Sequence, residues 1–433
     1  MSISFLLISS NLEFDLRDRY NSHMLRARYL FLVVPGLLFW CIASNWWLLD
    51  VTGIGTTENF IDLSWFYSYV GCIDNFSDIV LPSPINCSTL YNHGPGTSIL
   101  FWLILNSGVS VYMLGTFMII AITAALVLIS LKLGQDTLLA RVYQILLLLC
   151  PGMLLLFERG NIDGLIFLGL TVIIFGLYEK YPSISLFLLF LLSLVKFYTI
   201  FSVIFLILLG KSSIKKKILE IIFSLTIVLF FAVTIVDKIP YNWFLSFGSF
   251  MPLAYIDFTL KEFGLMPKII ESLTSHIEVR VFLGAIISFL IILFFYKFLK
   301  YYRILLKEMY HISTNSQLIS LSDIYFFCVS IIFITCYFFS TNYDYRMVFL
   351  VPSLILLDKK VSGKISQNFL LIFLAISTLL LGSIYSSPKY FLQGIQFFGD
   401  ISANLLVGVL LAYIMGCPNF SVPIYLKKIL RKL

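Results

Sequence analysis

The sequence predicts an all-α, polytopic membrane protein, and two observations carry that prediction. Of its 433 residues 60% are hydrophobic and only 12% are charged, whereas a water-soluble domain carries about a quarter charged residues. Apolar runs recur along the chain at lengths near the roughly 20 residues that cross hydrocarbon as a helix, without the period-two alternation of strands. A lipid bilayer is therefore the expected environment of most of the chain.

We predict one integral membrane domain over residues 1–433, a helical bundle of about twelve spans with a range of roughly 10–13. No Pro/Gly/Ser-rich linker and no fixed-period repeat divides the chain. The predicted spans are 29–49, 110–131, 139–156, 163–178, 183–195, 197–209, 218–236, 280–299, 323–340, 346–357, 368–385 and 400–416.

The basic residues predict the orientation of these spans. Most of the 30 lysines and arginines fall in alternate connecting segments, which the positive-inside rule assigns to the cytoplasm. Residues 1–28 lack the cleavage site of a signal peptide and form a cytoplasmic N-terminal segment, and 417–433 form a cytoplasmic tail. The loops 50–109 and 237–279 then lie outside, in the periplasm or extracellular space, and the protein is a multi-pass protein of the plasma (inner) membrane.

The run 183–209 is long for one span and short for two, and Lys196 is its only charge. If the run crossed once, the basic segment "KSSIKKK" would lie outside, so we predict two half-spans that meet at Lys196. Short or broken helices at membrane depth are tolerated where they line a protein cavity. The sequence therefore predicts broken helices around a cavity at the outer face.

Four polar side chains interrupt the apolar stretch "LLFERGNIDGLIFLGL" at the predicted outer boundary: Glu158, Arg159, Asn161 and Asp163. A charge in the bilayer costs roughly 2.5–3.5 kcal/mol on insertion scales, so such residues mark a functional site by default. The alternative is that they end two helices, with Gly160 turning the chain and Asn161 or Asp163 capping the next helix. Both interpretations stay open at this point.

Further polar and aromatic residues fall at the same predicted face. Asp62 lies among aromatics in the first outer loop, and Tyr91 with His93 precedes the second span. Asp344 and Arg346 stand before a short late span. A carboxylate can act as a general base, cations can bind a phosphate, and aromatic faces can hold a sugar. Interfacial anchoring by aromatics and cations is the alternative for each cluster taken alone.

The seven cysteines give one structural expectation. Cys72 and Cys87 share the first outer loop and can form a disulfide there in an oxidising compartment. The others are expected to be small buried hydrophobes; they are Cys41, Cys150, Cys328, Cys336 and Cys417. The four scattered histidines have no metal-ligand spacing, so we predict no metal and no bound cofactor. The net charge of +7 is explained by orientation, and no nucleic-acid partner is expected.

Five motifs together resemble the bacterial polyprenyl-phosphate-sugar-dependent glycosyltransferases of the GT-C class, which include mannosyltransferases and related hexosyltransferases. The resemblance covers roughly residues 29–357. A proline that often follows the lysine of the fourth motif in that family is missing here. The motifs are an Asp in the first outer loop, "YNHGPG", "RGNIDGLIF", "SLVKFYTIFSVIFLIL" and "NYDYRMVFLVP".

The resemblance implies an inverting glycosyltransferase that moves a sugar, a hexose such as mannose, from a polyprenyl monophosphate to a cell-envelope polysaccharide or glycolipid acceptor at the outer face. It implies Asp62 as the general base. Arg159 and Arg346, with Lys196, would neutralise the departing lipid phosphate. The remaining polar residues would shape the sugar and acceptor pocket; they are Glu158, Asn161, Asp163, Tyr91, His93 and Asp344.

Three other functions were weighed against glycosyl transfer. An O-antigen or capsule repeat-unit polymerase is also a polytopic enzyme with large outer loops, but it uses lipid diphosphates. A transporter or flippase of lipid-linked saccharide would show paired broken segments in related halves, and this chain has one candidate, at Lys196. A membrane scaffold without activity leaves the cost of Arg159 and Arg346 unexplained.

Overall fold

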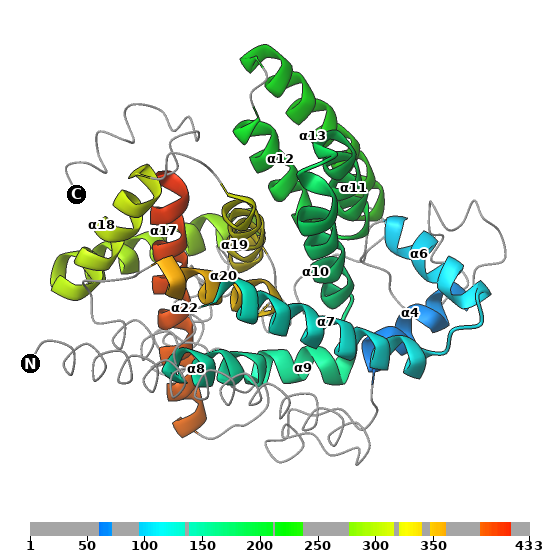
Figure 1. Cartoon of the computed structure of the whole chain (residues 1–433), viewed down its shortest axis with the longest axis horizontal. Coiled ribbons are helices and arrows are strands. Elements are labelled where there is room, and N and C mark those ends of the chain that lie inside the picture. The colour runs from blue at the N-terminus through cyan, green and yellow to red at the C-terminus, as the bar shows by residue number, and fades with distance from the viewer. Residues whose placement is uncertain are drawn as a thin grey trace, which may run out of the picture.

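The helical class predicted from the sequence is present in the structure, a computed structural model of the chain. The structure describes residues 60–71, 95–134, 138–210, 213–236, 277–315, 320–339, 347–360 and 390–416. Every regular element within these ranges is a helix. Figure 1 shows the helices arranged in several directions around a shared core.

The first described helices form a layer around α7 (Val111–Leu133). Helix α7 packs against α8 (Leu138–Leu148) and α9 (Pro151–Arg159), which run beneath it in Figure 1. Helix α4 (Ile61–Gly71) contacts α7, α9 and α6 (Pro95–Asn106). The aromatic ring of Phe66 stacks on Phe101 at 4.7 Å between ring centroids, so α4 and α6 form one unit.

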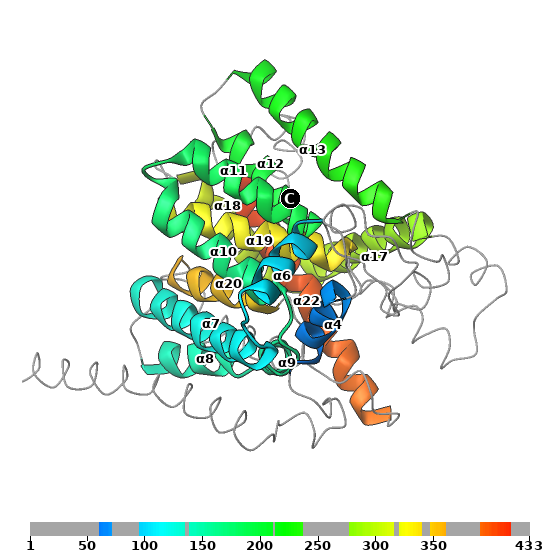
Figure 2. The same ribbon diagram turned by 90° about the vertical axis from the view of Figure 1, so that its right-hand side faces the viewer.

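The middle of the chain forms a group of upright helices in Figure 1. Helix α10 (Asp163–Val172) continues as the π-helix η2 (Ile173–Tyr178), and α11 (Pro182–Val195) packs back against both. A 3₁₀ turn, η3 (Phe197–Thr199), leads into α12 (Ile200–Leu209). Helix α13 (Ile214–Val236) then packs on α11 and α12 and runs along the upper edge of the molecule in Figure 2.

The C-terminal part contains two connected groups of helices. Helices α17 (Ile277–Phe298), α18 (Lys300–Asn315) and α22 (Tyr390–Gly416) pack on one another. Helix α19 (Leu321–Phe339) packs on α12, and α20 (Met347–Lys360) packs on α19, α10 and the α7 layer. Helix α20 is buried along most of its length, and it connects the two halves of the core.

The helix break predicted at Lys196 is confirmed. Helix α11 ends at Val195, and Lys196 has an extended backbone with φ −136° and ψ 117°. Helix α11 has 14 residues and α12 has 10. At about 1.5 Å per residue neither reaches the roughly 30 Å of a hydrocarbon core. Whether the two helices form half-spans in a membrane stays a prediction.

The span prediction was wrong in one place and incomplete in another. The continuous helix predicted over 139–156 is divided into α8 and α9, because Pro151 begins a new helix and holds Cys150 in an extended conformation. The segment after 299 is, as predicted, no apolar span, but the helix it forms, α18, was not predicted. Its charged residues lower the mean hydropathy of the segment, so a search for apolar runs does not find it. Its apolar residues Tyr302, Leu305 and Met309 nevertheless recur at helical spacing and are buried.

Within the described ranges, one helix is both long and apolar enough to cross a membrane. This is α7, with 23 residues and a mean hydropathy of 2.5, and the predicted span 110–131 coincides with it. Eight other apolar stretches of helix have 10–17 residues. The bundle of twelve spans thus stays a prediction, and the spans predicted at 29–49 and 368–385 lie outside the described residues.

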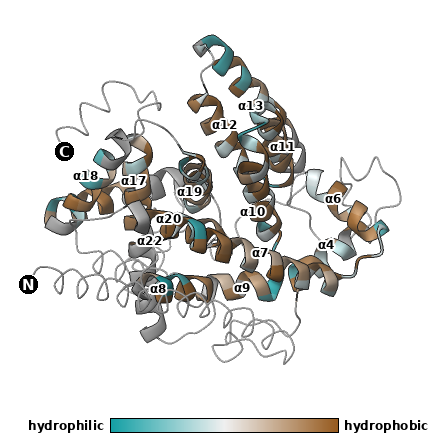
Figure 3. Cartoon of the chain, in the orientation of Figure 1, coloured by the Kyte–Doolittle hydropathy of each residue, from teal (hydrophilic) through white to brown (hydrophobic). Residues whose placement is uncertain are grey.

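Large apolar side chains cover the outside of several helices. On α7, Phe117 and Ile120 are exposed, whereas Met118 and Ile122 are buried on the other side. Leu219 and Phe223 of α13 are exposed as well. Figure 3 shows that hydrophobic residues make up most of the length of the helices. An apolar face of this kind marks contact with lipid or another protein.

The packing of α18 on α22 generates a prediction. A Cβ atom at Gly408 would clash with the hydroxyl of Tyr302, which is buried and donates a hydrogen bond to the Leu405 carbonyl at 3.0 Å. Gly408→Ala is expected to reduce stability by about 1–3 kcal/mol, seen as a lower thermal unfolding midpoint of the purified protein in detergent. Gly176→Ala is the control, because a Cβ there meets nothing within 4 Å. Equal midpoints for the two variants would contradict this packing.

Candidate functional site

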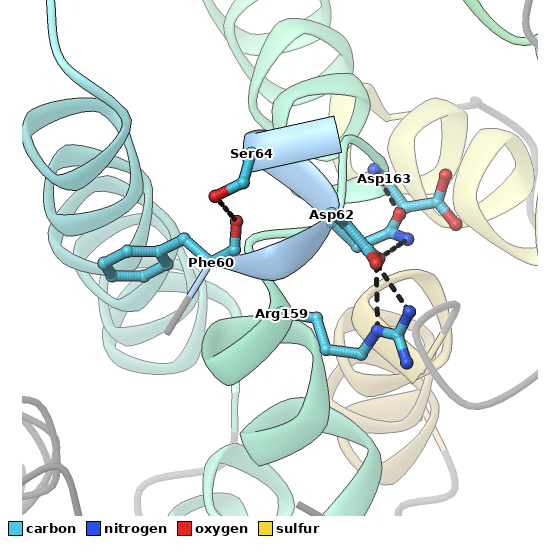
Figure 4. A network of polar contacts seen from close by, with 6 residues as sticks. Phe60, Asp62, Ser64, Arg159 and Asp163 are labelled. Atoms are coloured by element: carbon cyan, nitrogen blue, oxygen red, sulfur yellow. Dashed lines mark hydrogen bonds and ion pairs between the residues drawn. The ribbon is translucent and has the colours of Figure 1, made fainter. Parts of the chain in front are cut away.

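An ion pair between Asp62 and Arg159 forms the centre of the candidate site. Nε and Nη2 of Arg159 both donate hydrogen bonds to Oδ1 of Asp62, at 3.0 and 2.6 Å. Asp62 lies in the first turn of α4 and Arg159 ends α9. Figure 4 shows the arginine reaching from α9 to the start of α4. The two residues are 97 positions apart in the chain, and the structure brings them into direct contact.

Asn161 connects this pair to helix α10. Its Nδ2 donates to Oδ2 of Asp62 at 2.8 Å, and its Oδ1 accepts the backbone N–H of Asp163 at 3.0 Å. Asn161 therefore does what the capping alternative expects, since it satisfies an N–H group in the first turn of α10. It also fixes the second carboxylate oxygen of Asp62. Asn161 thus both caps a helix and belongs to the polar site.

A second acid–base pair lies beside the first. Oδ1 of Asp163 accepts a hydrogen bond from the hydroxyl of Tyr198 at 2.7 Å and is 3.6 Å from Nζ of Lys196. The side chain of Asp163 is 1% exposed and that of Lys196 is 16% exposed. The helix break after α11 gives both Lys196 and Tyr198 access to this carboxylate. Within the site, Asn161 joins the two pairs.

Tyr198 is a residue of this site that was not predicted from the sequence. A signal for it exists in "KFYT", where a polar aromatic follows the lysine of the helix break by two residues. Phenol hydroxyls that are buried normally take a hydrogen-bond partner. The ring of Tyr198 also lies edge-on to Phe349 of α20, with centroids 6.0 Å apart.

The turn between α9 and α10 depends on Gly160. This residue has the left-handed conformation, with φ 62° and ψ 42°, and its N–H donates to the carbonyls of Leu156 and Phe157. A glycine in this conformation is a common way to end a helix. A Cβ here would also approach Leu63 of α4 to 2.8 Å. The predicted turn at Gly160 is confirmed, and it lets α4 lie against the end of α9.

Phe60 holds the start of α4 in place. It is buried, and it has a φ of 64°, which is uncommon for a residue with a side chain. Its N–H donates to the carbonyl of Glu158 at 2.6 Å. Figure 4 shows its ring on the side of α4 away from Arg159. The ring fills the space that a side chain at Gly115 of α7 would need, where a Cβ would lie 2.5 Å from it. Strained backbone of this kind clusters at functional sites.

Glu158 and Trp65 complete the surroundings of the ion pair. The side chain of Glu158, predicted to shape the pocket, is fully buried. Trp65 is 54% exposed and follows Asp62 by three positions, on the same face of α4. The guanidinium carbon of Arg159 is 5.8 Å from the centre of the Trp65 ring, within the range of a cation–π interaction. Arg159 therefore lies between a buried carboxylate and an exposed indole.

Helix α6 begins next to the helix break. Thr97 donates a hydrogen bond to the carbonyl of Val195 at 2.9 Å. A Cβ at Gly96 would come within 3.0 Å of the Val195 backbone, so close approach requires glycine here. Tyr91 and His93 precede this helix by a few residues and lie outside the described residues. The last two residues of their motif, Pro95 and Gly96, thus belong to a helix that meets the residue before Lys196.

Helix α20 also begins near the site. Phe349 in its first turn lies 6.4 Å from Phe167 of α10 and 6.0 Å from Tyr198, between ring centroids. Arg346 directly precedes this helix, and both Arg346 and Asp344 lie outside the described residues. The predicted partner role of Arg346 stays a prediction.

Six helix ends and breaks therefore meet at one place. They are the starts of α4, α6, α10 and α20, the end of α9, and the break at Lys196. Asp62, Arg159, Asn161, Asp163 and Lys196, which the sequence analysis selected, form one connected set of contacts. The two acid–base pairs of this set are linked through Asn161.

The remaining sequence predictions give a mixed outcome. Cys150, Cys328 and Cys336 are buried, as predicted. Cys41, Cys417 and the proposed Cys72–Cys87 disulfide lie outside the described residues. In the part of the chain that the structure describes, no group of three or more His, Cys, Asp or Glu side chains is placed to hold a metal ion.

Comparisons with known proteins add no family assignment. No protein-family model, no curated protein and no solved structure matches the chain. The resemblance to the GT-C glycosyltransferases therefore depends on the sequence motifs alone.

The bridging position of Asn161 generates a prediction. Asn161→Ala removes the donor to Asp62 and the cap of α10, and is expected to lower stability by about 1–3 kcal/mol. Asn161→Asp should cost more, because it places a second carboxylate against Oδ2 of Asp62. Thermal unfolding measures both. The same two changes at the exposed Asn106, which bonds only the Trp102 carbonyl among the described contacts, serve as controls. Equal losses at the two positions would refute the bridge.

Proposed function

We propose that the protein is an integral membrane glycosyltransferase that transfers a sugar from a polyprenyl monophosphate to a hydroxyl of a glycan or glycolipid at the outer membrane face. One observation carries this proposal. A buried carboxylate, Asp62, is held in one set of hydrogen bonds with Arg159 and Asn161, beside a second pair formed by Asp163 and Lys196. Sequence motifs that resemble one enzyme class supply all five side chains.

The proposed reaction requires a base and a means of stabilising the leaving group. Asp62 removes the proton of the acceptor hydroxyl while its oxygen attacks the anomeric carbon. The bond from that carbon to the phosphate oxygen breaks, and its electron pair leaves with the polyprenyl phosphate. Arg159 and Lys196, with Arg346 from the segment before α20, neutralise the developing charge. Attack from the face opposite the leaving group inverts the configuration of the sugar.

A membrane location is supported by the distribution of apolar residues. Helix α7 is long and apolar enough to span a bilayer. Its exposed side chains Phe117 and Ile120 are as apolar as its buried ones, and α13 repeats this pattern. Helices that are apolar on all sides lie within a bilayer or deep inside a large protein. A lipid-linked donor suits such a protein, because the donor's polyprenyl chain stays in the bilayer while its sugar reaches the outer face. The inner membrane with both termini cytoplasmic is the proposed topology.

One observation favours a second function, transport of a lipid-linked saccharide. The helix break at Lys196 places a charged residue between two short helices, as in many transporters. Within the described residues, however, Lys196 belongs to the same set of polar contacts as Asp62. A transporter does not need Asp62 as a base. A repeat-unit polymerase differs in its donor, a lipid diphosphate. Offering both donors and following the sugar distinguishes these functions.

The role of Asp62 as the base can be tested by substitution. Asp62→Asn keeps the size of the side chain and removes its ability to accept a proton, so the transfer rate should fall by about 10²–10⁴-fold. The measurement follows a radiolabelled sugar from its polyprenyl phosphate to acceptor in proteoliposomes. Asp323→Asn is the matched control, because Asp323 is also a buried carboxylate but accepts hydrogen bonds from Ser320, just before α19, and from Tyr413. Full activity in Asp62→Asn would remove the base assignment.

The proposed topology can be tested by labelling. Ser107, in the exposed turn after α6, belongs to the outer loop, whereas the exposed Ser213 precedes α13 on the cytoplasmic side. In a variant whose seven native cysteines are replaced by serine, Ser107→Cys should react with a membrane-impermeant maleimide in intact cells. Ser213→Cys should react only after permeabilisation. Labelling of both positions from the same side would contradict the proposed orientation.

A further inference from the structure

Two groups with separate proposed tasks are bonded to each other in this structure. As a base, Asp62 needs an acceptor hydroxyl within roughly 2.6–3.2 Å of one of its oxygens. Its Oδ1 instead receives two N–H groups of Arg159, at 3.0 and 2.6 Å, and its Oδ2 receives Asn161 at 2.8 Å. The Nε–Nη2 edge of Arg159 can bind a phosphate bidentately only when it leaves Asp62. In the observed arrangement each group therefore occupies the other.

We propose that Arg159 changes partner in each catalytic cycle, from Asp62 to the phosphate of the lipid-linked donor, and that this exchange releases Asp62 to act as the base. The inference rests on the proposed function and concerns the order of events at the same site. It makes donor binding the step that prepares the carboxylate for the acceptor. It also assigns Arg159 a role in product release.

The surroundings of the pair allow the arginine to move and the carboxylate to stay. The Asp62 side chain is 9% exposed, and Asn161 holds the carboxylate oxygen that Arg159 does not contact, Oδ2. The Arg159 side chain is 23% exposed, and it begins at the last residue of α9. Its guanidinium lies 5.8 Å from the exposed ring of Trp65, which can accompany a movement towards solvent. Asp62 can thus keep its alignment when Arg159 leaves.

Charge changes during the reaction favour the exchange. The donor is a phosphodiester with one negative charge, and the leaving polyprenyl phosphate is a monoester with a charge of about −1.5 to −2 at pH 7. Arg159 is therefore drawn to the phosphate more strongly as the bond to the anomeric carbon breaks. At the same time Asp62 receives the acceptor proton and loses its negative charge. An interaction that strengthens only in the transition state accelerates the chemical step.

The reverse exchange completes the cycle. Asp62 passes its proton to water and becomes a carboxylate again. It then competes with the product phosphate for Arg159, and the product is released as the observed ion pair forms again. Asp163 and Lys196 are less suited to this exchange, because Nζ is 3.6 Å from Oδ1 and Tyr198 occupies the same oxygen.

Binding of the product lipid tests the exchange without any chemical step. The full-length protein in lipid nanodiscs is titrated with undecaprenyl phosphate, and the dissociation constant is measured for wild type, Asp62→Asn and Asp62→Ala. Both changes remove the charge that competes for Arg159. They should therefore tighten binding by about tenfold to a hundredfold, the range expected when one hydrogen bond to a charged group no longer has to be given up.

Controls separate the exchange from general effects of charge. Asp323→Asn removes one negative charge from a buried carboxylate outside the site and should leave binding as in wild type. Adding Arg159→Lys to Asp62→Asn should abolish most of the gain, because lysine lacks the bidentate geometry. Undecaprenol, which has no phosphate, should bind all variants alike. Thermal unfolding verifies that each variant is folded.

The outcomes separate this proposal from the function on which it rests. Unchanged or weaker binding in both Asp62 variants, equal tightening in Asp323→Asn, or no binding by any variant would overturn the exchange. Tighter binding in the Asp62 variants supports it, even if wild type transfers no sugar in the separate transfer assay. In that case the glycosyltransferase proposal fails, and the exchange of partners by Arg159 is still supported. If wild type transfers sugar but the Asp62 variants do not bind the lipid phosphate more tightly, the glycosyltransferase proposal stands and the exchange is refuted.

Discussion

The arrangement of this protein depends on one constraint, that a charge placed among apolar helices needs a partner. Breaking a buried ion pair by removing one partner typically costs about 3–5 kcal/mol. Asp62 and Arg159 satisfy each other, although 97 residues separate them. Their contact ties the start of α4 to the end of α9. The positions of α4 and α9 are thereby linked, and the remaining polar groups are arranged around the contact.

The helix ends at this site serve both structure and chemistry. Gly160 ends α9 in a left-handed conformation, and Asn161 caps α10. Lys196 separates the two short helices α11 and α12. Each of these structural roles is enough to explain why that residue type occurs at its position. Each also leaves polar groups at the point where helices stop, which is where a bundle of apolar helices can present hydrogen-bonding groups to a ligand. The capping interpretation and the site interpretation therefore describe the same atoms.

The backbone around the site adds rigidity on one side only. Phe60 has a positive φ, a hydrogen bond to the Glu158 carbonyl and a ring fixed against Gly115, so the start of α4 has little freedom. Arg159 has a partly exposed side chain and lies beside the exposed Trp65. A fixed carboxylate and a more exposed cation are what an enzyme needs if it aligns its base and lets its counter-ion follow the substrate.

The sequence by itself determined the helical class, the place of α7, the break at Lys196 and the candidacy of Asp62, Arg159, Asn161 and Asp163, because composition, apolar run length and an isolated charge are local properties. The helix α18 was missed, since charged residues on one face lower the average hydropathy of a helix that is apolar on the other. Only the tertiary structure decided that Arg159 pairs with Asp62, that Lys196 and Tyr198 share Asp163, and that Asn161 joins the two pairs. These pairings depend on contacts between segments up to 99 residues apart, and no local pattern encodes which carboxylate meets which cation.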